Sequence, residues 1–476
     1  MEQMKPTWTE IIEAIKGKLV YGRPEGTFSG VSADSRSIKP GELFIALTGE
    51  NFDGHNFIET ALQKGACGAI VRSGWFKGSS GLNDLNFFVV EVDDTLKALG
   101  DIAMLWREKH QILVVAITGS NGKTTTKEMA ALILSQKFRV LKTEGNLNNL
   151  IGLPLTVLNI DDSHDVAVLE LGMNSFGEIA RLSEICKPDI ALITNVGSGH
   201  LEGLGSIEGV AKAKGEILEG LKAGGTFVFN ADDSYIREIA KGWKGNLVSF
   251  GIDSPGADVK TLLTDYSCCY GSGVAISMHL KEKTLSAKLM GLGLHNVYNA
   301  TAAAAVGVAM GIGLEEIRKG LEEWRPFRGR FELHRLDCGV NLIDDTYNAN
   351  PNSVAMALKT LADVKGAGRG IAVLGDMLEL GAYAEEAHYE IGKKAASTGV
   401  DCLFLMGPHS SIHTYRGARD GGMDEGQIVI CSDYKDVSGH VNPILRGGDW
   451  VLVKGSRGMA MEKVVEEIKK RMKDKG

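Results

Sequence analysis

Apolar runs bounded by polar loops recur along this chain, and segments with helical spacing of apolar residues stand between them. The clearest run is Ile112–Ile117, six apolar residues without a charge, which predicts a strand buried on both faces. Similar runs at 43–47, 68–71, 165–169, 189–196, 274–280, 285–289, 340–343, 371–374, 402–406, 428–430 and 450–453 predict further strands. Strands that alternate with helices indicate an α/β fold with parallel sheets.

The runs fall into three groups, and a chain of 476 residues is long enough for about three domains. We expect a small α/β domain over 1–95, a central domain over 96–326 and a third α/β domain over 327–476. The third group predicts a Rossmann-like sheet. No G-x-G-x-x-G follows its first strand, so we expect no dinucleotide site there.

Composition narrows the class of protein. The chain is 44% hydrophobic and 24% charged, as ordinary soluble proteins are, and its net charge of −8 argues against broad nucleic-acid binding. Seven cysteines without a C-x-x-C pair indicate a reducing compartment and no zinc site. The first residues are charged, unlike a signal peptide, and the longest uncharged run, His295–Leu314, predicts a packed helix rather than a membrane span. We therefore expect a cytoplasmic protein.

The strand at Ile112–Ile117 runs into a glycine turn and then a helix-period segment, which is the context of a phosphate-binding loop. Gly119 and Gly122 allow a tight turn with inward N–H groups, Lys123 offers a charge for phosphates, and the Thr124 hydroxyl suits Mg²⁺. The first glycine of the usual spacing is replaced by Ile117. The alternative is therefore a plain glycine turn followed by a chance lysine.

Polar residues follow two further strands of the central group. Glu170 comes directly after the run at 165–169, and His200 comes just after the run at 189–196. Ligands of parallel α/β sheets sit at the carboxyl ends of the strands, so Thr124, Glu170 and His200 should converge. A carboxylate and a hydroxyl suit Mg²⁺, and an imidazole is a less usual ligand for a second ion. Each residue alone would more simply be a solvated loop residue.

The segment 206–221 has helical spacing and carries two lysines of different kinds. Lys214 lies four residues after Val210 and three before Ile217, on the apolar face, whereas Lys212 lies four residues from a glutamate on either side. Burial lowers the pKa of a lysine and leaves a neutral amine, which can react with CO₂ to give a metal-binding carbamate. The alternative is a lysine that extends from the edge of the apolar stripe into solvent.

Two polar stretches are candidates for substrate contacts. Ser35 and Arg36 precede a turn in the first domain, and an arginine fork suits a pyrophosphate, although a surface turn explains the same residues. The loop 143–154 contains three asparagines and two glycines. It is either the lining of a substrate channel or an Asx-rich turn.

Two more sets of residues are candidates for nucleotide or anion contacts. Asn296 and Asn299 are three apart at a predicted helix start, where amides suit an adenine edge but also cap helices. Lys454 and Arg457 follow the last strand and precede a helix, a place that favours anions.

Read together, the motifs resemble those of the Mur ligases of peptidoglycan synthesis, in the same order along essentially the whole chain. They are ITGSNGKTTTKEM, GNLNNLIGLP, ELGMN, NVGSGHLEGLGS, VAKAKGEI, NADD, GLHNVYNA, GRFE, DDTYNANPNS, GDMLELG and VLVKGSRGM. That family uses a phosphate loop without the leading glycine. Within it, the last three motifs look like the member that adds D-alanyl-D-alanine to a UDP-N-acetylmuramoyl-tripeptide. The member that adds the third amino acid usually carries Asp-Asn-Pro-Arg in its last domain, and this sequence does not.

The resemblance implies an ATP-dependent peptide ligase that works through an acyl phosphate, with ATP and two Mg²⁺ ions as cofactors. It implies a monomer with small-molecule substrates and no nucleic-acid partner. The first domain would bind the UDP end, the central domain ATP, and the last domain the dipeptide. No Ser or Cys nucleophile would be needed.

The resemblance also assigns roles to residues. Lys123, Glu170, His200, Lys214 and Arg330 would be catalytic. The metal ions would be held by Thr124, Glu170, His200 and carbamylated Lys214. ATP would be bound by Gly119, Ser120, Asn121, Gly122, Lys123, Thr124, Thr125, Asn296, Asn299, Arg330, Asp345 and Tyr347. The other substrates would be bound by Ser35, Arg36, Asn146, Asn149, Asp376, Glu379, Lys454 and Arg457.

Two other functions remain open. A ligase of the same fold that adds a different amino acid, or extends a folate tail, would differ in the amine that supports ADP release. A nucleotide-dependent switch without catalysis would need no second metal site, so the predicted convergence of Glu170, His200 and Lys214 argues against it.

Overall fold

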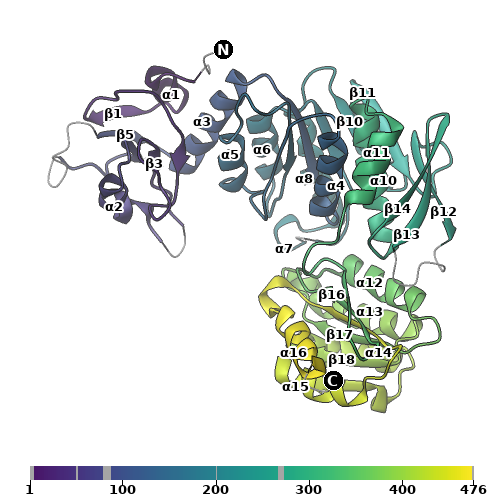
Figure 1. The fold of residues 1–476 in the computed structure, drawn as a ribbon. Helices are drawn as coiled ribbons and strands as arrows, with labels where there is room; N and C mark the ends of the chain where they lie inside the picture. Colours follow the sequence, from purple (N-terminus) through teal and green to yellow (C-terminus); the bar gives the residue numbers. More distant parts are fainter. Residues whose placement is uncertain (1–4, 50–51, 79–86, 200, 266–272, 474–476) are drawn as a thin grey trace.

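The computed structural model describes residues 5–49, 52–78, 87–199, 201–265 and 273–473. The first unit is a five-stranded sheet with a helix on each face, drawn in purple in Figure 1. Its strands, in spatial order, are β1 (Lys18–Tyr21), β5 (Phe88–Val92), β4 (Gly68–Arg72), β3 (Leu43–Ile45) and β2 (Val31–Ser32). Its helices are α1 (Trp8–Ala14), η1 (Gly54–Phe57) and α2 (Ile58–Gln63). Only β1 pairs antiparallel to its neighbour in this sheet.

The central unit is built on a nine-stranded sheet. In spatial order its strands are β14 (Lys283–Leu289), β13 (Val274–Leu280), β12 (Val259–Asp265), β11 (Asn246–Gly251), β10 (Thr226–Asn230), β9 (Ile190–Ile193), β6 (Leu113–Thr118), β8 (Val166–Glu170) and β7 (Val140–Lys142). The ladder is parallel from β7 to β12, and β13 and β14 add an antiparallel edge. The predicted central strand β6 is buried in its last five residues, as expected for a strand covered on both faces.

Helices cover both faces of the central sheet. They are α3 (Thr95–Lys109), α4 (Lys123–Ser135), α5 (Gly152–Val157), α6 (Glu178–Cys186), α7 (Leu201–Leu204), α8 (Ile207–Gly215), η2 (Glu216–Leu218), α9 (Ser234–Gly242), α10 (Leu294–Ala309) and α11 (Leu314–Glu323). Helices α4, α10 and α11 share one apolar cluster with one face of the sheet. Helix α3 packs on α1 of the first unit and on α5 and α6 of the central unit, so a single apolar cluster joins both units.

The C-terminal unit has a six-stranded sheet. Its order is β15 (Glu332–Arg335), β16 (Asn341–Asp345), β20 (Trp450–Lys454), β17 (Gly370–Gly375), β18 (Cys402–Met406) and β19 (Ile428–Cys431), all parallel except β15. Its helices are α12 (Pro351–Val364), η3 (Gly381–Tyr383), α13 (Ala384–Ser397), η4 (Ser410–Thr414), α14 (Tyr415–Asp420), η5 (Glu425–Gln427), α15 (Tyr434–Ile444), η6 (Arg457–Met459) and α16 (Glu462–Lys473). Asn350 caps α12 and Pro351 occupies its first turn, a sequence signature of a helix start.

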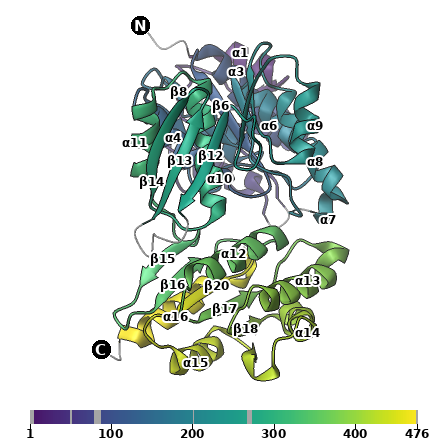
Figure 2. The same ribbon diagram turned by 90° about the vertical axis from the view of Figure 1, so that its right-hand side faces the viewer.

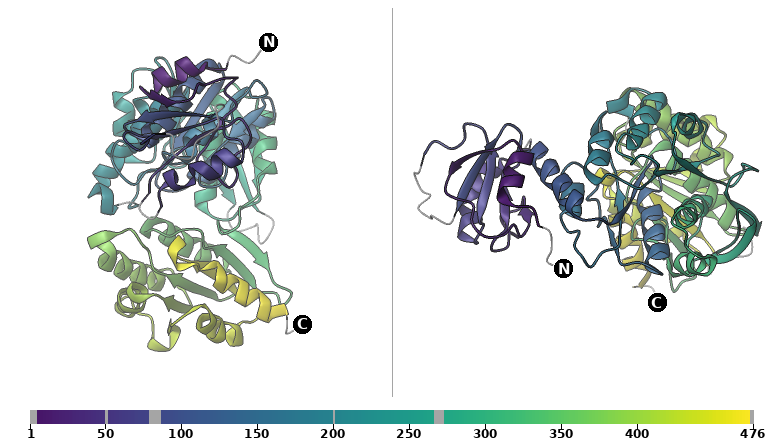
Figure 3. Two further views of the ribbon diagram at one scale, coloured as in Figure 1. Left: turned by 90° about the vertical axis from the view of Figure 1, so that its left-hand side faces the viewer. Right: turned by 90° about the horizontal axis from the view of Figure 1, so that it is seen from above.

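The predicted α/β class with three units is confirmed, and the apolar runs named from the sequence all contain strands. The stretch GRFE leads into β15, an edge strand antiparallel to β16. Figures 1 and 2 show the C-terminal unit facing the central unit, with α12 on its own side of the boundary and α7 on the central side, and Figure 3 shows the first unit set off to the side, beyond α3. Within the described residues, no helix is long and apolar enough to cross a membrane.

Candidate active site

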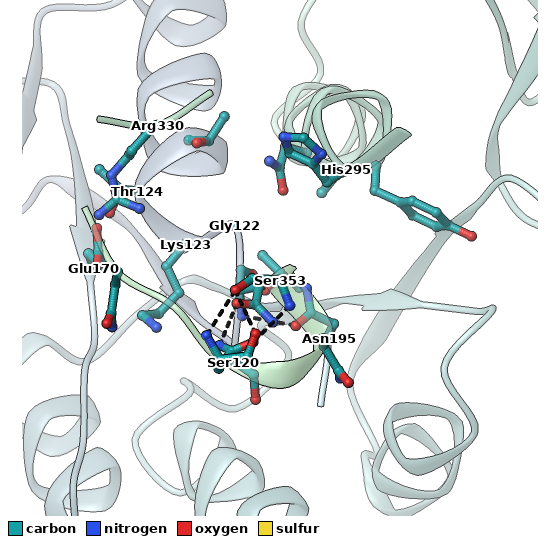
Figure 4. A pocket seen from close by; sticks show the side chains of 18 of the residues that line it. Ser120, Gly122, Lys123, Thr124, Glu170, Asn195, His295, Arg330 and Ser353 are labelled. Atoms are coloured by element: carbon teal, nitrogen blue, oxygen red, sulfur yellow. Dashed lines mark hydrogen bonds between the residues drawn. The ribbon is translucent and has the colours of Figure 1, made fainter. Parts of the chain in front are cut away.

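A cavity of about 610 Å³ lies where the central and C-terminal units face each other. Most of the residues predicted to bind nucleotide or substrate line it: Ser120, Asn121, Gly122, Lys123, Thr124, Thr125, Asn146, Asn149, Glu170, Asn296, Asn299, Arg330, Asp345, Tyr347 and Lys454. Figure 4 shows Thr124, Glu170 and Arg330 on one side of the view and His295 on the other, with Gly122 and Lys123 between them.

The phosphate loop has the strained backbone that its glycines predict. Gly119 has φ 150° and Gly122 has φ 80°. A Cβ on Gly119 would lie 1.8 Å from Thr194 Oγ1, and a Cβ on Gly122 would lie 2.1 Å from Asn299 Oδ1. Glycine is therefore required at both positions by space as well as by conformation. Gly122 immediately precedes α4, so the N-terminus of that helix faces the cavity.

Lys123 is held over the loop by a hydrogen bond from its Nζ to the Gly119 carbonyl oxygen (2.8 Å). Burial lowers the pKa of Lys123, the Glu170 carboxylate raises it, and Arg330 lowers it. Among the described residues, the Glu170 carboxylate is a nearby counter-charge for the Lys123 ammonium but forms no ion pair with it. A phosphate group in the cavity would supply one.

Glu170 ends β8 as predicted and is 2% exposed. Its Oε1 accepts a hydrogen bond from Asn148 Nδ2 (2.8 Å), and its Oε2 is buried without a hydrogen-bond partner among the described residues. An orphaned carboxylate oxygen beside the Thr124 hydroxyl, both lining the cavity, is the donor set that Mg²⁺ prefers. The sequence does not predict this role of Asn148, because its contact with Glu170 depends on how the loop folds.

Lys214 lies on α8 and is 1% exposed, which agrees with the buried face predicted from its spacing. Among the described residues its Nζ has no hydrogen bond or ion pair. Burial first, and then the neighbouring Lys123, lowers the pKa of Lys214 well below its ordinary value. Lys212 is exposed, as predicted, and lies over the Phe176 ring at 5.8 Å. His200 is outside the described residues.

The C-terminal unit contributes a second group of charges. Lys454 donates to Asp345 Oδ2 (2.6 Å) and to the Asn348 carbonyl oxygen (2.8 Å), and it is 2% exposed. Burial raises the pKa of Asp345, and Lys454 opposes that shift. The Arg330 guanidinium stacks on the Tyr347 ring at 3.9 Å. These residues therefore form one packed wall of the cavity.

The opposite end of the cavity is built by the start of α10. Asn296 and Asn299 are both buried, but each already has a bond: Asn296 Nδ2 donates to the Leu292 carbonyl oxygen (2.7 Å), and Asn299 Oδ1 accepts from Thr126 Oγ1 (3.3 Å). His295 also lines the cavity, which the sequence did not predict. Burial lowers the pKa of His295 to about 3, and its Nδ1 is buried without a hydrogen-bond partner among the described residues.

Several predicted residues lie outside the cavity lining. Arg36 is paired with Asp34 in its own turn, with an 88% exposed side chain. Asp376 is buried under the loop after β18, where its carboxylate accepts from the backbone N–H of Ser410 (2.7 Å). Ser35, Glu379 and Arg457 are likewise absent from the lining, although the Arg457 guanidinium lies 5.8 Å from the Tyr347 ring. The structure thus gathers the predicted nucleotide residues together with Asn146, Asn149 and Lys454, and leaves the other predicted substrate residues outside the lining.

The polar loop 143–154 is an Asx-rich turn that also lines the cavity. Asn149 Oδ1 accepts from the backbone N–H groups of Ile151 (3.1 Å) and Gly152 (2.8 Å), just before and at the first residue of α5. Asn146 and Asn149 both face the cavity. The loop is therefore an Asx-rich turn that also lines the cavity, and its contact with substrate stays a prediction.

Comparisons with known proteins agree along the whole chain. Family models described as the Mur ligase family catalytic domain, the Mur ligase middle domain and the Mur ligase, glutamate ligase domain match residues 27–107, 117–307 and 329–457. The UDP-N-acetylmuramoyl-tripeptide–D-alanyl-D-alanine ligase of Bacillus subtilis (strain 168) is 36% identical over 466 residues, 98% of each chain. That of Escherichia coli (strain K12) is 36% identical over 465 residues, 97% of this chain and 98% of the relative.

Solved structures give the same result. A crystal structure of MurF from Acinetobacter baumannii has a TM-score of 0.88 and 31% identity, covering 99% of this chain and 100% of that one. The MurF ligase of Thermotoga maritima, solved in complex with ADP, has a TM-score of 0.82 and 29% identity, covering 94% and 98%.

Proposed function

This chain belongs to the Mur ligase family, and we propose that it joins the amine of D-alanyl-D-alanine to the carboxylate of UDP-N-acetylmuramoyl-tripeptide at the expense of ATP. The observation that carries this proposal is the single cavity shared by the phosphate loop and the C-terminal residues Asp345, Tyr347 and Lys454. A nucleotide there would contact both units, and the acceptor would enter between them.

The reaction needs an activated carboxylate, since a free carboxylate is a poor electrophile. A carboxylate oxygen of the tripeptide attacks the γ-phosphorus of ATP, the bond to the β-phosphate oxygen breaks, and ADP leaves. The dipeptide amine then attacks the acyl-phosphate carbon, phosphate leaves, and the amine loses a proton. Lys123 and Arg330 line the cavity and would balance the negative charge that develops on the transferring phosphoryl group.

Glu170 and Thr124 would hold Mg²⁺, because a buried carboxylate oxygen without a partner and a hydroxyl line the same part of the cavity. Bound Mg²⁺ supplies charge neutralisation for the phosphates. A second ion would use His200 and a carbamate on Lys214, formed when the neutral amine adds to CO₂ and releases one proton. Carbamylation is supported by the burial of Lys214 and by its lowered pKa. It predicts a ¹³C resonance in protein equilibrated with ¹³CO₂ that Lys214→Met lacks; loss of that difference would refute it.

We further propose that residues 1–95 hold the UDP end, residues 96–326 hold ATP, and residues 327–476 hold the dipeptide. Ser35 and Arg36 would lie near the diphosphate, which requires Arg36 to exchange Asp34 for the ligand. The peptide and dipeptide sites would be shaped by Asn146 and Asn149 and, from the last unit, by Asp376, Glu379, Lys454 and Arg457. A monomer suffices, since one chain lines a complete cavity; gel filtration at working concentration would test this.

Phosphate release with ATP, Mg²⁺ and UDP-N-acetylmuramoyl-tripeptide tests the main proposal. D-Alanyl-D-alanine should support turnover and give the UDP-linked pentapeptide by mass, whereas lysine, diaminopimelate, D-glutamate and L-glutamate should not. Running the assay with lysine- and diaminopimelate-containing tripeptides identifies the third residue. Glu170→Gln keeps the side-chain shape and should abolish turnover. Turnover with a single amino acid would favour another ligase of this fold. ATP hydrolysis at the same rate with every amine would favour a nucleotide-dependent switch.

A further inference from the structure

One side-chain contact joins the phosphate loop directly to the C-terminal unit. Asn350 Nδ2 donates a hydrogen bond to Asn121 Oδ1 at 2.8 Å, across 229 residues of sequence. Asn121 lies in the phosphate loop between Ser120 and Gly122, and Asn350 is the N-cap of α12. Figure 4 shows the neighbouring Ser120, Asn195 and Ser353 gathered in one group of hydrogen bonds at the base of the cavity.

Asn121 is fixed on the central side. Its backbone N–H donates to Asn195 Oδ1 (2.9 Å), and its carbonyl oxygen accepts from Asn195 Nδ2 (3.0 Å) and from Thr194 Oγ1 (2.6 Å). Both partners belong to the segment that follows β9. The position of Asn121 is therefore set by the same backbone that shapes the phosphate loop.

Asn350 is equally fixed on the C-terminal side. Its Oδ1 accepts from the Ser353 backbone N–H (2.9 Å) as a helix cap, which identifies Nδ2 as the atom that faces Asn121. The residues just before it are tied to the last strand and its loop, because Lys454 binds the Asn348 carbonyl oxygen and Ser456 Oγ binds that of Ala349 (3.2 Å). The contact thus joins two pieces that are rigid within their own units.

Within the described part of the chain, two further contacts join the units away from the phosphate loop. Leu292 of the central unit packs into the apolar cluster of the C-terminal unit together with Phe331, and Tyr383 Oη donates to the Gly205 carbonyl oxygen (3.1 Å). Apolar packing tolerates small shifts, whereas a hydrogen bond between two held amides is lost within about 1 Å. The hydrogen bond between Asn350 and Asn121 is therefore suited to fix the position of the C-terminal unit relative to the phosphate loop.

We propose that Asn350 is a positioning residue that docks the C-terminal unit onto the phosphate loop through Asn121. Docking places Asp345, Tyr347 and Lys454 at a fixed offset from Lys123, so that both units contact one nucleotide. This inference rests on the proposed nucleotide site, and it does not depend on which amine is ligated. Losing the contact lowers the fraction of enzyme docked for chemistry, while ATP still binds the phosphate loop.

Asn350→Ser is the informative variant, because serine caps a helix as well as asparagine does but cannot reach Asn121. We expect kcat to fall about threefold to tenfold, as for one net hydrogen bond, with KM for ATP within about twofold of wild type. Combined with Asn121→Ala, it should add nothing to the loss caused by Asn121→Ala alone. A kcat for Asn350→Ser equal to wild type, or losses that multiply in the double variant, would overturn the proposal.

Ser353→Ala is the matched control, since it removes the other half of the capping box and leaves the Asn350 amide in place. The loss of kcat in Ser353→Ala should multiply with the loss in Asn121→Ala, because the two residues act independently. If Ser353→Ala instead adds nothing to the loss in Asn121→Ala, as expected for Asn350→Ser, the role of Asn350 is helix capping alone. Small-angle scattering with ADP and Mg²⁺ gives a readout without turnover. Wild type should become more compact than Asn350→Ser, and equal profiles would count against docking. Compaction in a wild type that ligates no dipeptide would refute the proposed function and leave the docking contact standing.

Discussion

Replacing Lys214 by methionine should stabilise the protein while abolishing its activity. Lys214 is 1% exposed and lies on α8, where Val210 and Ala213 are buried as well. Burial disfavours the Lys214 ammonium, and moving a polar group from water into such a site costs about 1–3 kcal/mol. Methionine fills a similar volume without that cost. We therefore expect Lys214→Met to raise the free energy of unfolding by about 1–3 kcal/mol at pH 7.

The pH dependence sharpens this prediction. Burial lowers the pKa of Lys214 in the folded protein, so the unfolded chain binds a proton that the folded chain does not. The stability of wild type should rise with pH between the lowered pKa and the ordinary value of 10.5, by up to about 1.4 kcal/mol per pH unit. The methionine variant lacks this contribution. Its advantage over wild type should therefore shrink as pH rises from 7 to 9.

Urea unfolding in CO₂-free buffer with chelator at pH 7, 8 and 9 measures this difference, because it removes carbamate and metal from both proteins. Lys212→Met is the matched control on the same helix; it is exposed and should change stability by less than about 0.5 kcal/mol. A Lys214→Met variant less stable than wild type at pH 7, or an advantage that does not shrink with pH, would mean that the ammonium is charged and paired in the folded protein.

Three shorter predictions follow from the cavity. Gly119→Ala should lower kcat/KM for ATP at least about hundredfold, because a strain of about 3 kcal/mol at the loop suffices for that factor; near-normal kinetics would mean that Thr194 moves aside. Because the pKa of His295 is lowered to about 3, wild-type stability should fall as pH drops from 6.5 towards 3, and His295→Gln should remove up to about 1.4 kcal/mol of that loss per pH unit in acid denaturation series. Lys454→Met should lower the free energy of unfolding in urea by about 3–5 kcal/mol, because Asp345 is left buried and unpaired. Adding Asp345→Asn to Lys454→Met should restore most of that free energy, and equal losses in the single and the double variant would contradict this.

The pattern of apolar and polar residues predicted the structure correctly where it depends on which face of a single strand or helix is buried. The uncharged run at Ile112–Ile117 predicted β6, and the spacing of Lys214 against Val210 predicted its buried face. Contacts set by distant segments were out of reach. Asn121 meets Asn350 only because two units dock, across 229 residues of sequence.

The burial of the His295 ring could not be predicted from the sequence either. It stands beside Asn296 in a helix start that periodicity predicts well, but its isolation arises from tertiary packing on Phe331, which approaches from the linker between units. Phe331 has φ 58° and Gly329 φ 72°, so the chain turns sharply on either side of Arg330. No propensity predicts a left-handed phenylalanine, and the turn is what aims both Arg330 and Phe331 at the cavity.

The charge arrangement of the cavity supports a site for a nucleotide with a metal ion, although acidic residues in the lining outnumber lysines and arginines. Asp232 accepts from three backbone N–H groups, and Asp233 caps α9, so the hydrogen-bond acceptors of these two carboxylates are already satisfied within the fold. Asp345 is paired with Lys454. Glu170 alone among these acids keeps a buried oxygen without a partner in the described part of the chain. The remaining unbalanced charges are therefore a carboxylate on one side and the cations Lys123 and Arg330 on the other, an arrangement that a triphosphate would complete only together with a divalent cation at Glu170.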